Sequence, residues 1–105
     1  MYGMINRLKA HPGKRDAAIE PMLQESVPVE GCLSFVVALD PTDPDVFWLT
    51  EVWTSKEAWQ ASVALPEIKA GIDRMIPLIA DWGIEVVTEP VGGIGLSIKR
   101  RGLIV

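Results

Sequence analysis

The chain has 105 residues, 49% of them apolar and 23% charged, and a formal net charge of -4. This length fits one domain, the apolar content excludes an intrinsically disordered chain, and the negative charge argues against a general nucleic-acid-binding surface. So much apolar sequence in so short a chain predicts exposed apolar surface and therefore favours an oligomer.

The first residues predict a strand followed by a helix. Residues 2–9 mix apolar and polar side chains and end at the turn residues 11–13, so alternation places four side chains on one face: Tyr2, Met4, Asn6 and Leu8. A helix is expected from Asp16, as its N-cap, to about Ser26. Pro21 predicts either a kink or a start nearer Glu20, and Pro28 ends the helix.

Two β-prone segments follow, at residues 32–39 and 46–53. Residues 40–45 between them hold two prolines and three carboxylates but lack the spacing and the glycine of a calcium loop, so a hairpin connection is expected. Cys32 is the only cysteine, which excludes an intrachain disulfide and a CxxC metal or redox motif.

The second half predicts two helices, a last strand and a tail. Thr54 and Glu57 match a capping box for a short helix through about Ser62. Pro66 begins the next helix, which Pro77 should bend in its last turn. That helix presents apolar side chains at helical spacing, at Ile68, Ile72, Met75, Ile76 and Ile79. Trp82-Gly83 breaks it, residues 84–89 form a strand, and residues 91–105 form an arm on a partner subunit or a mobile tail.

The predicted order is β-α-β-β-α-β with the second helix broken in two, the split βαβ pattern of ferredoxin-like α+β domains. One antiparallel sheet with helices on one side leaves its other face open. Two such sheets facing each other through an isologous contact would form a dimeric α/β barrel. We therefore expect a domain at residues 1–90 and a C-terminal extension at residues 91–105.

Few residues have the pattern of a catalytic or metal site. His11 is the only histidine, which argues against a zinc or iron centre, and no phosphate-binding glycine loop is present. The four tryptophans, at positions 48, 53, 59 and 82, serve either as packing or as walls of an apolar pocket for a flat aromatic ligand. Asn6 lies mid-strand among apolar residues, where its amide needs a partner, either backbone or ligand.

Several short motifs, in this order and spacing, resemble those of the antibiotic biosynthesis monooxygenase family across about residues 1–90. They are Pro12-Gly13-Lys14, Glu30-Gly31-Cys32, Glu51-x-Trp53-x-Ser55-x-Glu57-Ala58-Trp59, Pro66-Glu67-x-Lys69-Ala70 and Pro77-Leu78-Ile79. The resemblance implies a homodimeric barrel with a cleft between sheet and helices in each subunit. It also implies oxygenation of polycyclic phenols or quinols by O2 with no metal, flavin or haem, because the substrate anion itself reduces O2.

A haem-degrading branch shares this fold and carries an Asn-Arg-Leu run, present here as Asn6-Arg7-Leu8. Its haem-ligating histidine and ring-distorting tryptophan align with Ile72 and Ser62, so haem degradation is disfavoured. Many other family members have a histidine near the end of the short helix, and here that residue is Ser62. A hydroxyl cannot act as a base near neutral pH as an imidazole can.

The sequence thus predicts a cofactor-independent monooxygenase acting on an aromatic phenol or quinol with O2. Asn6 and Ser62 are its predicted catalytic residues, Trp53, Trp59 and Ile72 line the substrate site, and no metal or cofactor is expected. The alternative is a non-catalytic dimeric ligand-binding or stress-response module. Haem binding is a third and weaker hypothesis. No apolar run approaches the roughly 20 residues of a membrane helix and the N-terminus lacks a signal-peptide pattern, so a cytoplasmic homodimer without nucleic-acid or membrane partners is expected.

Overall fold

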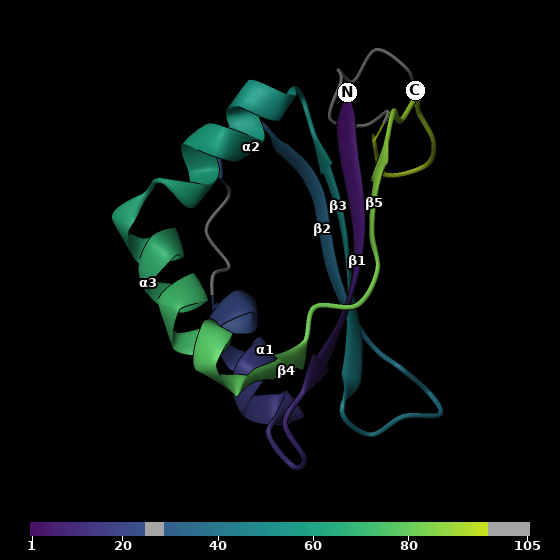
Figure 1. The fold of residues 1–105 in the computed structure, drawn as a ribbon. Coiled ribbons are helices and arrows are strands. Elements are labelled where there is room, and N and C mark those ends of the chain that lie inside the picture. The colour runs from purple at the N-terminus through teal and green to yellow at the C-terminus, as the bar shows by residue number, and fades with distance from the viewer. Residues whose placement is uncertain (25–28, 97–105) are drawn as a thin grey trace.

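The structure, a computed structural model, describes residues 1–24 and 29–96. Its elements are β1 (Tyr2–Ala10), α1 (Arg15–Gln24), β2 (Cys32–Leu39), β3 (Val46–Trp53), α2 (Lys56–Val63), α3 (Pro66–Met75), the 3-10 turn η1 (Ile76–Leu78), β4 (Ile79–Asp81) and β5 (Glu85–Thr88). The three α-helices lie in one layer against one face of the sheet (Figure 1). This confirms the predicted α+β ferredoxin-like class, with the last strand divided in two.

The sheet is antiparallel, in the order β2-β3-β1, and both β4 and β5 pair with the free edge of β1. Tyr2 on β1 lies opposite Trp53 on β3, and Asn6 lies opposite Leu49. β5 pairs with the first half of β1 and β4 with its end, where the register shifts. Alternation along β1 and β3 therefore sends alternate side chains of both strands toward the helices.

The predicted end of the third helix is wrong, and Pro77 explains the difference. Proline has no backbone N–H to continue the α-helical hydrogen bonds, so α3 ends at Met75 and η1 follows. The chain is extended at Ile79, which begins β4 and packs in the core as a strand residue rather than on the helix stripe. The predicted strand at residues 84–89 corresponds to β5, which is shorter.

Two helix starts also differ from the prediction. Ser55, not Thr54, caps α2, because the Ser55 hydroxyl oxygen accepts a hydrogen bond from the Ala58 N–H at 3.0 Å. Ala58 then occupies the third helical position, so Glu57 cannot close a capping box. α1 begins at Arg15, so Asp16 lies in its first turn and is not its N-cap. The helix contains Pro21, so a start nearer Glu20 is wrong as well. The predicted helix end near Ser26 lies outside the described residues, as do positions 97–105.

The core fills one end of the space between the layers. Its buried side chains come from β1, α1, β3, α3 and β4: Leu8, Ala10, Ala18, Ile19, Phe47, Leu49, Met75 and Ile79. Phe47 is fully buried. α1 and α3 pack together over this end, and the space toward α2 is left for a cavity.

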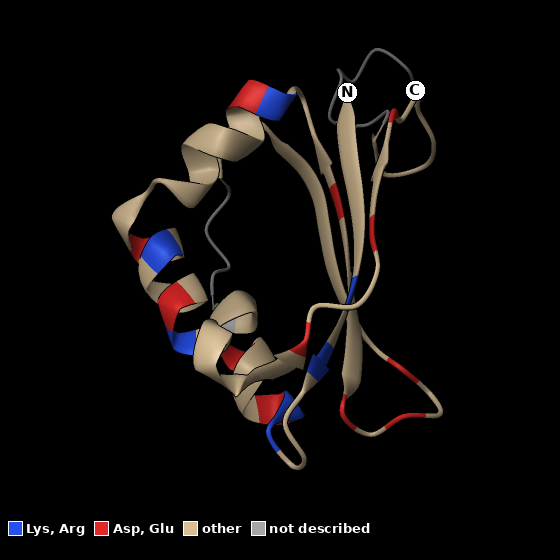
Figure 2. Ribbon diagram, in the orientation of Figure 1, with Lys and Arg blue, Asp and Glu red and all other residues tan. Residues whose placement is uncertain are grey.

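The opposite face of the sheet is uncovered in a single chain and carries a mostly apolar row. One row across the four strands consists of Val36, Thr50, Ile5 and Val86, each paired with the next. The exposed fraction is 52% for Val36 and 42% for Val86. Figure 2 shows few charges along these strands. No helix in the described part of the chain has the length and apolar character needed to cross a bilayer.

The acidic loop between β2 and β3 is a hairpin connection held by its own hydrogen bonds. The Asp40 carboxylate accepts hydrogen bonds from the Trp48 indole at 3.0 Å, the Thr42 hydroxyl and the Asp43 N–H. These bonds, that of Trp48 first, hold the pKa of Asp40 well below its usual range. The Arg15 guanidinium donates to the Asp43 carbonyl at 3.0 Å. Within residues 1–24 and 29–96, no three His, Cys, Asp or Glu side chains form a metal-ligand group.

Candidate functional site

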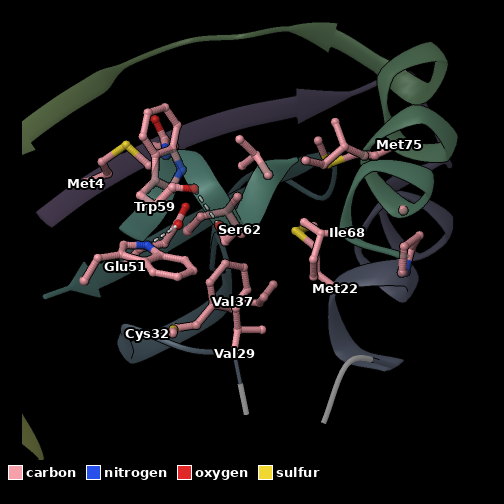
Figure 3. Close-up of a pocket in the computed structure, with 18 of the residues that line it drawn as sticks. Met4, Met22, Val29, Cys32, Val37, Glu51, Trp59, Ser62, Ile68 and Met75 are labelled. Carbon is pink, nitrogen blue, oxygen red and sulfur yellow. Dashed lines mark hydrogen bonds between the residues drawn. The ribbon is translucent and has the colours of Figure 1, made fainter. Parts of the chain in front are cut away.

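A cavity of about 920 Å³ lies between the sheet and the helices. Its floor comes from β1, β2 and β3, and its walls come from α1, α2 and α3. Figure 3 shows Glu51 and Trp59 toward one end, and Met22, Ile68 and Met75 toward the other. Most of the lining is apolar, and the volume falls in the range of small-molecule sites.

All five site residues expected from the sequence line this cavity. Asn6 comes from β1 and Trp53 from β3, while Trp59 and Ser62 come from α2 and Ile72 from α3. They converge because β1 and β3 are adjacent in the sheet and α2 and α3 lie against the same face of these strands. The fold thus brings Asn6 on β1 next to residues of three consecutive elements, β3, α2 and α3.

Asn6 is a polar group on the cavity floor. It is partly buried between Leu49 on β3 and Glu85 on β5. Its side-chain amide makes no hydrogen bond to another residue that the structure describes. An amide in such surroundings offers two donors and an acceptor to whatever enters the cavity.

Ser62 is 4% exposed, and its hydroxyl donates a short hydrogen bond of 2.6 Å to the Trp59 carbonyl (Figure 3). The hydroxyl has a single hydrogen, so this bond leaves only its oxygen lone pairs for a ligand. Ser62 can therefore accept a hydrogen bond in the cavity but has no second proton to donate.

Three tryptophans line the cavity, Trp53, Trp59 and Trp82, and the first two are the aromatic residues predicted for the site. Trp53 is 4% exposed, and its indole N–H donates to the Glu51 carboxylate at 3.0 Å. The Trp59 ring is tilted by 32° against the ring of Tyr2, with centroids 5.7 Å apart. Such large, rigid surfaces suit a flat aromatic molecule, which they contact at little cost in side-chain entropy.

Glu51 is a site residue that the sequence reasoning did not select. It is 7% exposed and lines the cavity, and burial raises the pKa of its carboxyl while the Trp53 hydrogen bond acts in the opposite direction. The signal was present: Phe47, Leu49, Glu51 and Trp53 occupy alternate positions of one strand. A carboxylate on the apolar face of a strand is unusual enough to mark a functional position.

Haem would lack its expected ligand here. The lining contains no histidine, and His11 lies in the turn after β1, outside the cavity. Ile72 and Ser62 offer no imidazole to an iron. The residues of the cavity therefore do not fit axial haem ligation of the kind found in the haem-degrading branch.

Comparison with known proteins places this fold and cavity in a family. The sequence pattern described as antibiotic biosynthesis monooxygenase matches residues 1–74. A search of curated proteins finds no match.

Solved structures agree with this match. One from Chloroflexus aurantiacus J-10-fl, named as a candidate antibiotic biosynthesis monooxygenase, is 46% identical over 90% of this chain and 97% of its own, with a TM-score of 0.86. One from Deinococcus radiodurans with the same designation is 24% identical, covers 90% of this chain and 96% of its own, and has a TM-score of 0.73; it supports the fold alone. The chain therefore belongs to the antibiotic biosynthesis monooxygenase family.

Proposed function

We propose that this protein is a monooxygenase that oxidises an aromatic phenol or quinol with O2, using no metal or organic cofactor. Family membership supports a monooxygenase-like role in general. The observation that carries the finer proposal is the apolar, tryptophan-walled cavity with the Asn6 amide on its floor. That combination suits a flat apolar molecule with one oxygen to be held.

In the proposed reaction the substrate itself supplies the electrons that reduce O2. Loss of a hydroxyl proton gives a delocalised anion, and this anion supplies the electrons that reduce O2. For a ring CH2 group the balance is CH2 plus O2 to C=O plus H2O, with one oxygen atom in the product and one in water. The protein must exclude water and stabilise the anion, which Asn6 does by donating a hydrogen bond to the anionic oxygen.

The other site residues set shape and orientation. Trp53, Trp59 and Ile72 form the walls against which the rings pack. Ser62 accepts a hydrogen bond from a second hydroxyl of the substrate, consistent with its own proton being held by the Trp59 carbonyl. The uncovered sheet face supports a homodimer in which two such faces cover each other, and we place this dimer in the cytoplasm.

Oxygen uptake with hydroxyanthrone and hydroquinone substrates tests this function. Wild-type protein should consume O2, and Asn6→Ala should lower kcat/KM by about tenfold or more because the anion loses its donor. An equally folded Asn6→Ala variant with wild-type rates would remove Asn6 from the site. The absence of uptake across a broad phenol and quinol panel would contradict the function as a whole.

A non-catalytic binding module is the second candidate, and the state of Ser62 favours it. The residue at the usual histidine position is a serine, and its proton is already donated within α2. Ligands that quench tryptophan fluorescence with no O2 uptake would select this alternative.

A further inference from the structure

Glu51 is a buried carboxylate on the cavity floor, and the chemistry proposed above gives it no role. Its cross-strand neighbours are Met4 on β1 and Phe35 on β2, both apolar. The Trp53 indole binds one oxygen, Oε1, at 3.0 Å. The second oxygen, Oε2, has no hydrogen bond to any residue within the described part of the chain.

No cation neutralises this carboxylate within residues 1–24 and 29–96. The other titratable side chains of the lining are Arg7, Cys32, Glu67, Arg74 and Glu85. The ion pairs among described residues are Lys9–Asp43 and Lys69–Asp73, and neither involves Glu51. Three carboxylates line the cavity, and Glu67 and Glu85 are exposed whereas Glu51 is buried. A buried acid without a counter-ion is costly for folding, which points to a role in the cavity.

Glu51 and Asn6 lie diagonally across two paired strands. Glu51 is directly opposite Met4, and Asn6 is two residues further along β1 on the same face. Diagonal neighbours of this kind have Cβ atoms about 7 Å apart. A substrate oxygen between them can therefore accept a hydrogen bond from the Asn6 amide while its proton points at the Glu51 carboxylate.

We propose that Glu51 is the general base that removes the hydroxyl proton of a neutral hydroxylated aromatic substrate, while Asn6 holds the anion that forms. The inference deepens the proposed function and rests on it. The substrate O–H bond breaks, an O–H bond forms on Glu51, and the electron pair stays on the substrate oxygen. After the anion adds O2, Glu51 returns the proton to the peroxide anion, and the hydroperoxide then loses water to leave the carbonyl product.

Two consequences follow for the residues around the base. Trp53 is a positioning residue, because its N–H holds Oε1 and leaves Oε2 to take the proton. The substrate is neutral on binding, because a second negative charge beside an unpaired buried carboxylate would be repelled. Carboxylated or sulfonated analogues should bind more weakly than neutral ones of the same shape.

Glu51→Gln tests the base, with Glu57→Gln as a matched control on the exposed face of α2. Glutamine has the same shape and still accepts the Trp53 N–H, so the fold should persist, but it cannot take a proton. We expect kcat/KM to fall by about 100-fold or more in Glu51→Gln and to change less than about twofold in Glu57→Gln. Raising the pH until the substrate ionises in solution should restore much of the lost rate. A Glu51→Gln enzyme with wild-type rate and pH profile would overturn the proposal.

A bound dye provides a readout that does not depend on turnover. The probe is a hydroxyanthraquinone whose phenol stays neutral in water at pH 7 and whose absorption shifts on ionisation. Bound at neutral pH, it should show the anion spectrum on wild type and on Glu57→Gln, and the neutral spectrum on Glu51→Gln. A neutral spectrum on wild type, or the same spectrum on all three proteins, would contradict the role of Glu51. Failure of O2 uptake by wild type would instead contradict the proposed function. The dye spectra would then still show whether Glu51 takes the proton of a bound phenol.

Discussion

At the scale of single residues, the site depends on two polar groups placed on an apolar sheet face. Asn6 and Glu51 lie on adjacent strands, and each occupies a position where burial disfavours an unpartnered polar side chain. Burial acts on them differently. The amide stays neutral and offers hydrogen bonds, whereas burial raises the pKa of the carboxyl and makes it a better proton acceptor.

Trp53→Phe should move the acid limb of the kcat/KM profile to higher pH. The indole N–H stabilises the charged form of Glu51, so its loss raises the pKa of that carboxyl further. Relative to the variant's own plateau, the rate on the limb should fall by about threefold to tenfold, and the plateau should lie below that of wild type because the variant loses part of the substrate wall. A limb that stays in place or moves to lower pH would show that the indole does not tune Glu51.

At the scale of elements, alternation and turn residues predict β2 and β3 to the residue, because each is bounded by a glycine turn or a proline-rich loop. The start of α3 at Pro66 was predicted, whereas its C-terminal end and the division of the last strand were not predictable in this way. They depend on two features that act on neighbouring residues: Pro77 ends the α-helix, and the edge of β1 pairs with the residues that follow. The Ser55 cap was missed because Thr54 and Ser55 are both good caps, and backbone geometry chooses between them.

Asp40→Asn should lower the stability of the hairpin loop in a pH-dependent way. The folded pKa of Asp40 is depressed, so its charged form stabilises the fold above the unfolded pKa of about 4. This stabilisation is lost as the pH falls from there toward the folded pKa. The Tm of the variant should therefore lie below that of wild type at pH 7, and the gap should narrow below about pH 4. Asp81→Asn, at an exposed position on β4, is the control; a gap that does not change with pH would contradict this account.

At the scale of the whole molecule, the core fills one end of the space between the layers and the cavity fills the other, and the sequence predicted five of the residues that line this cavity. Asn6, Trp53, Trp59, Ser62 and Ile72 stand out by residue type or by family motif. Glu51 stands in the same family motif and on the apolar face of its strand, but its place in the cavity shows only in the assembled layers, because the strand pattern does not state which helices cover that face. The open sheet face is likewise a property of the assembled layers.

The central claim is that O2 oxidises a hydroxylated aromatic molecule in this cavity without a metal or organic cofactor. Turnover of hydroxyanthrone under 18O2, with metal chelator present and no added cofactor, tests it most directly. We expect one 18O atom in each product molecule, one molecule of O2 consumed for each, and labelled product formed more slowly, by about tenfold in Asn6→Ala and about 100-fold in Glu51→Gln. Product without 18O, or wild-type turnover that ceases with the chelator, would contradict it.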